Sequence, residues 1–275
     1  MTGGTQEAGR INQNLAIAAQ ETGIAIGVGS QRAMIEHPEL APTFQVRKYA
    51  PEILLFANLG AVQLNYGYGI NECRMAVEMI EADGLILHFN ALQEALQPEG
   101  DTNFAGLAKK IENICRSLDV PVIAKEVGWG FSEADIHLLA EAGIKAIDVA
   151  GAGGTSWSQV EMYRAQNPSQ QQLAAAFQNW GIPTSEAIQN VRRAANHLMV
   201  FASGGLRSGL DIAKCLVLGA RLGGMAGPFL KAAASSVEDT IQAVREIQHE
   251  LQVCLFITGA KDLNAFANMR LEKIQ

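Results

Sequence analysis

The strongest constraint on the fold of this chain is a regular alternation of short apolar segments with longer amphipathic ones. Seven short apolar runs have the length expected of buried strands: Ile24–Val28, Ile53–Asn58, Gly84–Asn90, Val120–Glu126, Ala146–Val149, Met199–Ser203 and Leu222–Ala226. Helical periodicity marks the stretches between them, among them Asn12–Thr22, Asn71–Glu81, Leu107–Leu118, Glu133–Glu141 and Leu210–Leu218. Because strands that alternate with helices form a parallel sheet, the chain is predicted to be an α/β protein.

Glycine-rich turns follow most of the predicted strands, and this nearly symmetric series favours a TIM (β/α)₈ barrel over an open sheet. A closed barrel of this type has eight strands, whereas the sequence shows seven. The chain begins with Met1-Thr2-Gly3-Gly4, a glycine turn of the kind that follows a strand. We therefore expect the first strand to be missing from the given chain, and interpret residues 1–275 as a single, N-terminally incomplete barrel domain.

One connection is unusually long. Trp157 to His197 separates the strands that begin at Ala146 and Met199, and it contains the Gln-rich stretch Gln166–Gln178. Loops of this length are usually lids, binding loops or interfaces. Thr184 or Ser185 is predicted to cap the helix that follows.

Composition narrows the range of partners. Hydrophobic residues make up 48% of the 275 residues, which suits one large buried core, and the net charge of −7 argues against a nucleic-acid partner. No apolar run approaches the roughly 20 residues that span a bilayer, and no signal peptide follows Met1. The cysteines have no CxxC spacing, so we expect reduced thiols in a cytoplasmic protein: Cys73, Cys115, Cys215 and Cys254.

Polar or glycine residues stand at nearly every predicted strand end, whereas the strand bodies are apolar. In a barrel of parallel strands these ends meet at one rim, where active sites form. The ends are Ser30-Gln31-Arg32, Asn58-Leu59-Gly60, His88-Phe89-Asn90, Lys125-Glu126, Gly151–Ser156, Gly204–Arg207 and Ala226-Gly227.

The last two of these ends have the character of a phosphate site. Gly204–Gly209 precedes a helix, and Ala226–Phe229 follows the next strand. Glycines let backbone N–H groups approach an oxyanion, and a helix N-terminus adds a favourable dipole. The alternative is that the glycines only make tight turns, but Arg207 favours a phosphate.

Lys125 lies near the end of an apolar strand, where an ammonium is costly unless it meets an anion or a cofactor. It could form a Schiff base, or face the N1–C2=O edge of a flavin and stabilise the reduced form. A structural alternative is a pair with Glu126.

The segment His88–Glu94 brings further chemistry to the rim. His88 and Asn90 share one face of their strand, Gln93 and Glu94 follow, and Glu94 could hold Mg²⁺ beside ligand phosphates. A core histidine is the alternative for His88. Trp129 and Trp157 are equally compatible with a pocket wall and with packing.

Taken together, these residues resemble type II isopentenyl-diphosphate isomerases, which depend on FMN. The matching segments are Met1–Gly4, Gly29–Arg32, Ala57-Asn58, His88–Glu94, Pro121–Glu126, Gly153–Trp157, Gly204–Arg207 and Ala226-Gly227. His88–Glu94 and Gly29–Arg32 are specific to this family, whereas the glycine turns and the lysine are shared with other FMN-binding barrels. Family members carry an upstream segment, with the first strand and an Arg-Lys element, that the given chain lacks.

The resemblance implies an FMN-binding barrel that interconverts isopentenyl and dimethylallyl diphosphate in isoprenoid biosynthesis. Reduced FMN would be the acid–base cofactor, NADPH its reductant, and the protein a homo-oligomer without nucleic-acid or membrane partners. The implied FMN contacts are Thr2, Gly3, Ser30, Asn58, Lys125, Thr155, Gly204, Gly205, Arg207, Ala226 and Gly227. The implied substrate contacts are Ser30, Gln31, Arg32, His88, Asn90 and Gln93. Gln93 and His88 would be catalytic, and Glu94 would bind Mg²⁺.

Two other functions compete with this interpretation. An FMN-dependent 2-hydroxy-acid dehydrogenase shares the lysine and the phosphate site, but it needs a histidine at the rim, and His197 precedes its strand at the opposite end. An inosine-monophosphate-dehydrogenase-like enzyme needs a cysteine in Gly151–Trp157, which has none. The absent strand also suggests an inactive, truncated flavin-binding chain.

Overall fold

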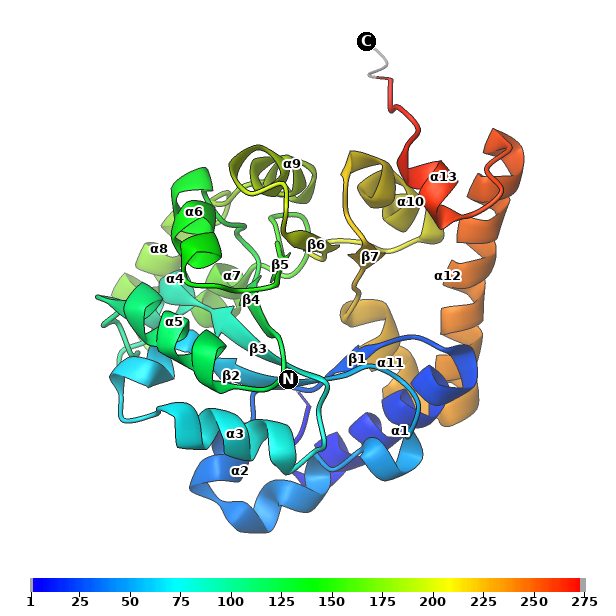
Figure 1. Ribbon diagram of the computed structural model, residues 1–275. Helices are drawn as coiled ribbons and strands as arrows, with labels where there is room; N and C mark the ends of the chain where they lie inside the picture. The colour runs from blue at the N-terminus through cyan, green and yellow to red at the C-terminus, as the bar shows by residue number, and fades with distance from the viewer. Residues whose placement is uncertain (1, 273–275) are drawn as a thin grey trace.

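A computed structural model describes residues 2–272 and shows one curved sheet of seven parallel strands surrounded by helices (Figure 1). Neighbouring strands in the sequence are neighbours in the sheet, in the order β1 to β7. The strands are β1 Ile26–Gly27, β2 Leu55–Gly60, β3 Gly84–Phe89, β4 Val122–Glu126, β5 Ala146–Asp148, β6 Met199–Ala202 and β7 Leu222–Gly223. The predicted α/β fold and all seven predicted strands are therefore confirmed. Most are shorter than predicted, and β1 and β7 are shortest because each pairs on one side only within residues 2–272.

The helices cover the outer surface of the curved sheet (Figure 1). The predicted helices are all present, and short 3₁₀ segments join them. Besides α1 Gln6–Thr22, the elements up to β5 are α2 Arg32–Glu36, η1 Pro38–Thr43, η2 Arg47–Tyr49, η3 Ala61–Asn65, α3 Ile70–Glu78, α4 Ala91–Leu96, α5 Leu107–Ser117 and α6 Glu133–Glu141. After β6 come α10 Gly209–Leu218, α11 Gly227–Ser235, α12 Val237–Thr258 and α13 Leu263–Ala267. Helix α1 begins six residues earlier than predicted because the Thr5 hydroxyl accepts from the Ala8 N–H and caps it.

Helices from the two halves of the chain come together on the side of the ring where β1 and β7 lie. Helix α1 packs against α11 and α12 there (Figure 1). The Asn14 side chain donates to the Ala233 carbonyl at 2.8 Å, and Gln248 donates to the Thr22 carbonyl at 3.0 Å. Segments more than 200 residues apart thereby join on one side of the barrel.

The long connection between β5 and β6 is helical, and its predicted cap is wrong. It contains α7 Trp157–Arg164, α8 Pro168–Ala176 and α9 Thr184–Ala194. Pro183 occupies the N-cap position of α9, and Thr184 is the first helical residue. The Thr184 hydroxyl is unavailable for capping because it donates to the Gly204 carbonyl at 2.6 Å.

The two faces of the sheet bury different clusters. Leu85, Leu87 and Ile147 belong to the main core, which lies between the sheet and the helices. The alternate residues form a separate cluster inside the ring, made of Phe56, Ile86, Ile123, Ala146 and Phe201. A buried apolar side chain stabilises a fold by roughly 1.5–3 kcal/mol. This inner apolar layer lies inside the barrel, and it forms the floor beneath the residues that follow it along the strands.

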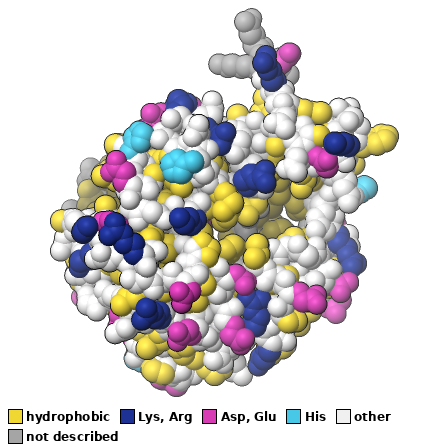
Figure 2. Space-filling view, viewed as in Figure 1, with side chains coloured by type: hydrophobic (Ala, Val, Ile, Leu, Met, Phe, Trp, Pro, Cys, Tyr) yellow, Lys and Arg dark blue, Asp and Glu magenta, His cyan; other side chains and the backbone are white. Residues whose placement is uncertain are grey.

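Acidic and basic side chains are interspersed on the face shown in Figure 2, which is hollowed near its centre. The four cysteines are free, and burial raises the pKa of the Cys73 thiol to about 12. Within the part of the chain that the structure describes, no helix combines the length and apolar character needed to cross a bilayer.

Candidate active site

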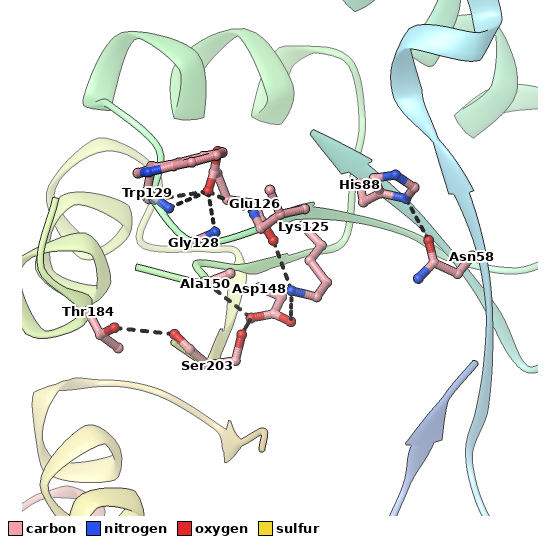
Figure 3. A network of polar contacts seen from close by, with 12 residues as sticks. Asn58, His88, Lys125, Glu126, Gly128, Trp129, Asp148, Ala150, Thr184 and Ser203 are labelled. Carbon is pink, nitrogen blue, oxygen red and sulfur yellow. Dashed lines mark hydrogen bonds and ion pairs between the residues drawn. The ribbon is translucent and has the colours of Figure 1, made fainter. Parts of the chain in front are cut away.

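A polar layer lies directly beyond the apolar layer inside the barrel. Each apolar residue of the inner cluster is followed, two positions along its strand, by a residue that can hydrogen-bond or carry charge. The five polar residues are Asn58 after Phe56, His88 after Ile86, Lys125 after Ile123, Asp148 after Ala146 and Ser203 after Phe201. Since side chains two apart in a strand point to the same face, five neighbouring strands present these groups to one space (Figure 3).

The residues of the polar layer are linked in strand order by side-chain contacts or by strand register. The His88 ring Nδ1 lies 2.8 Å from the Asn58 Oδ1. His88 and Lys125 are register partners in β3 and β4, as are Lys125 and Asp148 in β4 and β5. The Lys125 Nζ lies 3.4 Å from the Asp148 Oδ2, and Ser203 donates to the Asp148 Oδ1 at 2.6 Å. These contacts form a polar belt around the inside of the barrel.

His88 is held as a neutral imidazole. The Asn58 amide donates to the Val28 carbonyl at 3.0 Å, so the Asn58 Oδ1 is left to accept the proton on the His88 Nδ1. Burial, followed by the nearby Lys125 ammonium, lowers the pKa of His88 to about 4. At neutral pH the ring is therefore uncharged.

Lys125 is paired, although not with the Glu126 carboxylate. Its ammonium donates to the Glu126 carbonyl at 2.8 Å, and its nearest carboxylate is Asp148. The Glu126 carboxylate instead accepts backbone N–H groups, of which Trp129 is the closest at 2.6 Å. Burial raises the pKa of the Glu126 carboxyl, against the effect of these bonds. Glu126 thus shapes the loop after β4, and the Lys125 ammonium lies beside Asp148 inside the barrel.

The loops after β5 and β6 approach each other through glycines. Gly204 and Gly205 have φ values of +100° and +83°, which L side chains rarely adopt. A Cβ atom added to Gly205 would lie 2.3 Å from the Gly153 carbonyl oxygen. Thr184 ties this pair of loops to α9 through its bond to Gly204. Bare backbone therefore lines this part of the rim, as a phosphate cradle requires.

The other predicted phosphate residues lie on the same part of the rim. Arg207 is exposed, and its backbone N–H donates to the Asp211 carboxylate just before α10. Thr155, Ala226 and Gly227 are exposed at the ends of their loops, and α11 begins at Gly227.

The predicted metal and substrate residues form a network on the β1–β3 side. The Glu94 Oε1 accepts from the Asn90 amide at 2.6 Å, and its Oε2 accepts from the Asp101 N–H at 2.7 Å. The Asp101 carboxylate in turn accepts from Arg32 at 3.1 Å. Arg32 and Glu94, far apart in sequence, are therefore joined through the segment that precedes α5. No cluster of three metal-binding side chains occurs within residues 2–272, so phosphate or water oxygens would have to complete a site at Glu94.

Gln93 has a partner that the sequence did not reveal. Its amide donates to the Glu161 Oε1 at 3.0 Å, and Gln97 donates to the same oxygen at 2.9 Å. Glu161 lies on α7 in the long connection and is 9% exposed. The connection thus reaches the rim through a buried carboxylate that fixes a predicted catalytic amide.

Thr2 joins the rim, whereas Gln31 does not. Thr2 packs so closely on Gly29 that a Cβ added there would lie 2.4 Å from the Thr2 carbonyl oxygen. This places Thr2 and Gly3 beside Ser30; Met1 lies outside the described residues. The Gln31 side chain is fully buried, donating to the Ala76 carbonyl and accepting from the Asn58 N–H. Its contact with Asn58 connects it to the site only indirectly.

Comparison with known proteins decides the family. The model for FMN-dependent dehydrogenases matches residues 86–273, more than half of the chain. The isopentenyl-diphosphate delta-isomerase of Nostoc sp. is 56% identical over 265 residues, which are 96% of this chain and 75% of the relative. The same-named protein of Rickettsia bellii is 48% identical and covers 100% of this chain and 81% of its own length. The chain belongs to the isopentenyl-diphosphate delta-isomerase family.

Solved structures support the same fold across a wider range of sequences. A mandelate oxidase is 17% identical and aligns with a TM-score of 0.62 over 93% of this chain and 72% of its own. A lactate oxidase of Pediococcus acidilactici, at 16% identity, aligns with a TM-score of 0.61 over 97% of this chain and 71% of its own. At this identity the likeness establishes the TIM-barrel fold alone. The support for the competing dehydrogenase function is therefore weaker than the support for membership of the isomerase family.

Proposed function

We propose that this protein interconverts isopentenyl diphosphate and dimethylallyl diphosphate, with reduced FMN bound against the polar layer. The observation that carries the proposal is 56% identity, over 96% of the chain, to a protein named for that isomerase activity. The match to the FMN-dependent dehydrogenase model supports FMN as the cofactor.

The chain offers the two environments that FMN needs. Its phosphate fits the glycine-lined loops, where Gly204, Gly205, Ala226 and Gly227 can present backbone N–H groups and Arg207 adds charge. Its ring system would lie inside the barrel, where Lys125 would supply the cation and Asn58 a hydrogen-bonding amide. Thr2, Gly3, Ser30 and Thr155 would complete the contacts.

Substrate residues would act from the opposite side of the rim. Ser30, Arg32, His88 and Asn90 surround the place proposed for the diphosphate, and Glu94 would hold Mg²⁺ between protein and phosphate oxygens. Gln31 would act through Asn58, which it positions. Gln93, fixed by Glu161, would stand at the reacting end of the substrate.

The reaction moves a proton and a double bond without net redox. The terminal alkene carbon gains a proton, and the methylene carbon on the other side of the branched carbon loses one. Reduced FMN, when bound, supplies the acid–base chemistry, and the inner apolar layer excludes water from the reacting carbons. NADPH would serve only to reduce the flavin. We further propose a cytoplasmic homo-oligomer without nucleic-acid or membrane partners.

The test is to incubate the protein with FMN, Mg²⁺ and isopentenyl diphosphate after anaerobic reduction of the flavin. We expect proton NMR to show dimethylallyl diphosphate accumulating while the flavin absorbance remains that of the reduced form. No conversion, combined with oxidation of mandelate or lactate by the FMN-loaded protein, would support the dehydrogenase alternative instead.

A further inference from the structure

Asp148 is the charged residue of the polar layer that the proposed chemistry leaves without a role. It lies in β5 beside Ile147, and next to Val149, and both of these apolar residues are fully buried. The Asp148 side chain is only 14% exposed. A carboxylate in such a strand is costly unless other groups neutralise and hydrogen-bond it.

Three groups satisfy the Asp148 carboxylate (Figure 3). Its Oδ2 faces the Lys125 ammonium at 3.4 Å, and its Oδ1 accepts from the Ser203 hydroxyl at 2.6 Å. The Ala150 N–H approaches the Oδ1 at 3.4 Å, with Ala150 at a φ of +34°. Two neighbouring strands and a tight turn thus fix this carboxylate beside the lysine.

The charge on Lys125 is consequently shared between Asp148 and any ligand in the barrel. An ammonium aimed at a flavin favours the reduced, anionic form, because reduction adds negative charge at the N1–C2=O edge. A carboxylate at salt-bridge distance offsets part of that attraction. Proton exchange needs a reduced flavin that remains basic, so complete stabilisation of the anion would oppose the reaction.

We propose that Asp148 is a positioning residue that orients Lys125 and limits how strongly it favours reduced over oxidised flavin. This inference rests on the proposed FMN site. Ser203 supports it by fixing the carboxylate, and His88, on the other side of Lys125, is neutral and adds no competing charge at neutral pH.

The experiment measures the dissociation constants of oxidised FMN and of anaerobically reduced FMN for the apoprotein and its variants. The informative quantity is the ratio of the oxidised to the reduced constant, which is independent of turnover. We expect Asp148→Asn to raise this ratio about tenfold, equivalent to about 30 mV for a two-electron couple. Lys125→Met should change it in the opposite direction. Ser203→Ala, which removes a hydroxyl without changing charge, should change it less than about threefold.

An unchanged or lowered ratio in Asp148→Asn would overturn the inference. If Asp148→Asn does not fold, Asp148→Ser makes the same comparison with a smaller neutral side chain, and it too must raise the ratio. Asp148→Glu, which keeps the charge, should stay near the wild-type value. Failure of the wild-type protein to bind either form of FMN would instead reject the proposed function.

Discussion

The two sides of the barrel rim are formed by different kinds of groups, side chains on one side and backbone on the other. On the β1–β3 side, charged and amide side chains hold one another, as in the contacts that link Arg32, Asp101 and Glu94. On the β5–β7 side, backbone groups and glycines approach closely, and Thr184 fixes the Gly204 turn. The first side can therefore be altered by changing a functional group, whereas the second is altered by adding a single carbon atom.

The largest expected effect is on the β5–β7 side of the rim, called here the backbone side because backbone groups and glycines form it. In Gly205→Ala the new Cβ would meet the Gly153 carbonyl at 2.3 Å in a left-handed conformation that already costs about 1–2 kcal/mol. We expect FMN affinity to fall roughly a hundredfold, which corresponds to about 2.7 kcal/mol. Riboflavin, which lacks the phosphate, should lose much less affinity in the same fluorescence titration.

Gly259→Ala is the matched control for this variant. Gly259 has a similar φ of +71°, but a Cβ there would meet nothing within 4 Å. Its FMN affinity should equal that of the wild type. Equal losses of FMN and riboflavin in Gly205→Ala would show that the loop does not contact the phosphate.

The second-largest effect is expected on the β1–β3 side of the rim, called here the side-chain side because charged and amide side chains form it. Glu94→Gln removes a charge but can keep one of the two hydrogen bonds that Glu94 accepts. We expect roughly 10–100-fold weaker Mg²⁺ activation, the range found when metal-site groups are altered, with FMN binding retained. Glu99→Gln, an exposed carboxylate in the same segment, is the control. A Glu94→Gln enzyme with an unchanged Mg²⁺ titration would place the metal elsewhere.

A pH effect should also distinguish the two sides, because His88 lies on the β1–β3 side and its pKa is shifted. The pKa of His88 is lowered to about 4, so between pH 6.5 and 4 the unfolded chain binds a proton that the folded chain does not. The free energy of unfolding should therefore fall as the pH drops through this window, by on the order of 2 kcal/mol. Urea denaturation at several pH values measures the slope.

The slope should be smaller in His88→Asn, whereas His137→Asn, at an exposed position of α6, should keep the wild-type slope. If His88→Asn and the wild type lose stability in parallel between pH 6.5 and 4, the folded protein does not hold His88 neutral.

The smallest effect concerns the bond that joins the long connection to the glycine turn. Thr184→Val retains the shape but leaves the Gly204 carbonyl without its hydroxyl donor at 2.6 Å. The loss of one hydrogen bond, about 1 kcal/mol, should weaken FMN binding somewhat less than tenfold. Thr184→Ser keeps the hydroxyl and should restore most of the affinity. Equal affinities in Thr184→Val and Thr184→Ser would show that the bond does not shape the cradle.

Much of the fold and part of the site could be predicted from the sequence, because both follow from local patterns. Strand–helix alternation predicted the parallel barrel, and the position of Lys125 in an apolar strand marked it as unusual. The same reasoning applies to Asp148, an acid between apolar residues in a predicted strand, although no role is assigned to it from the sequence. That signal was present in the sequence and was missed.

Other parts of the site depend on contacts that no local pattern encodes. Glu161 meets Gln93 across 68 positions, and Asp101 meets Arg32 across 69. The Thr184 side chain bonds to Gly204 instead of capping its own helix, because a loop 20 residues away offers a carbonyl. Gln31 looks like a rim residue by its place after a strand, yet its side chain turns into the core.

On the proposed function, the backbone side binds the FMN phosphate while the polar layer receives the flavin ring. A crystal structure of the protein with reduced FMN tests this most directly. We predict phosphate oxygens in hydrogen-bond contact with backbone N–H groups of Gly204 and Gly205, and the Lys125 ammonium beside the N1–C2=O edge of the ring. A flavin ring bound away from Lys125, or a phosphate held on the Arg32 side of the rim, would contradict the claim.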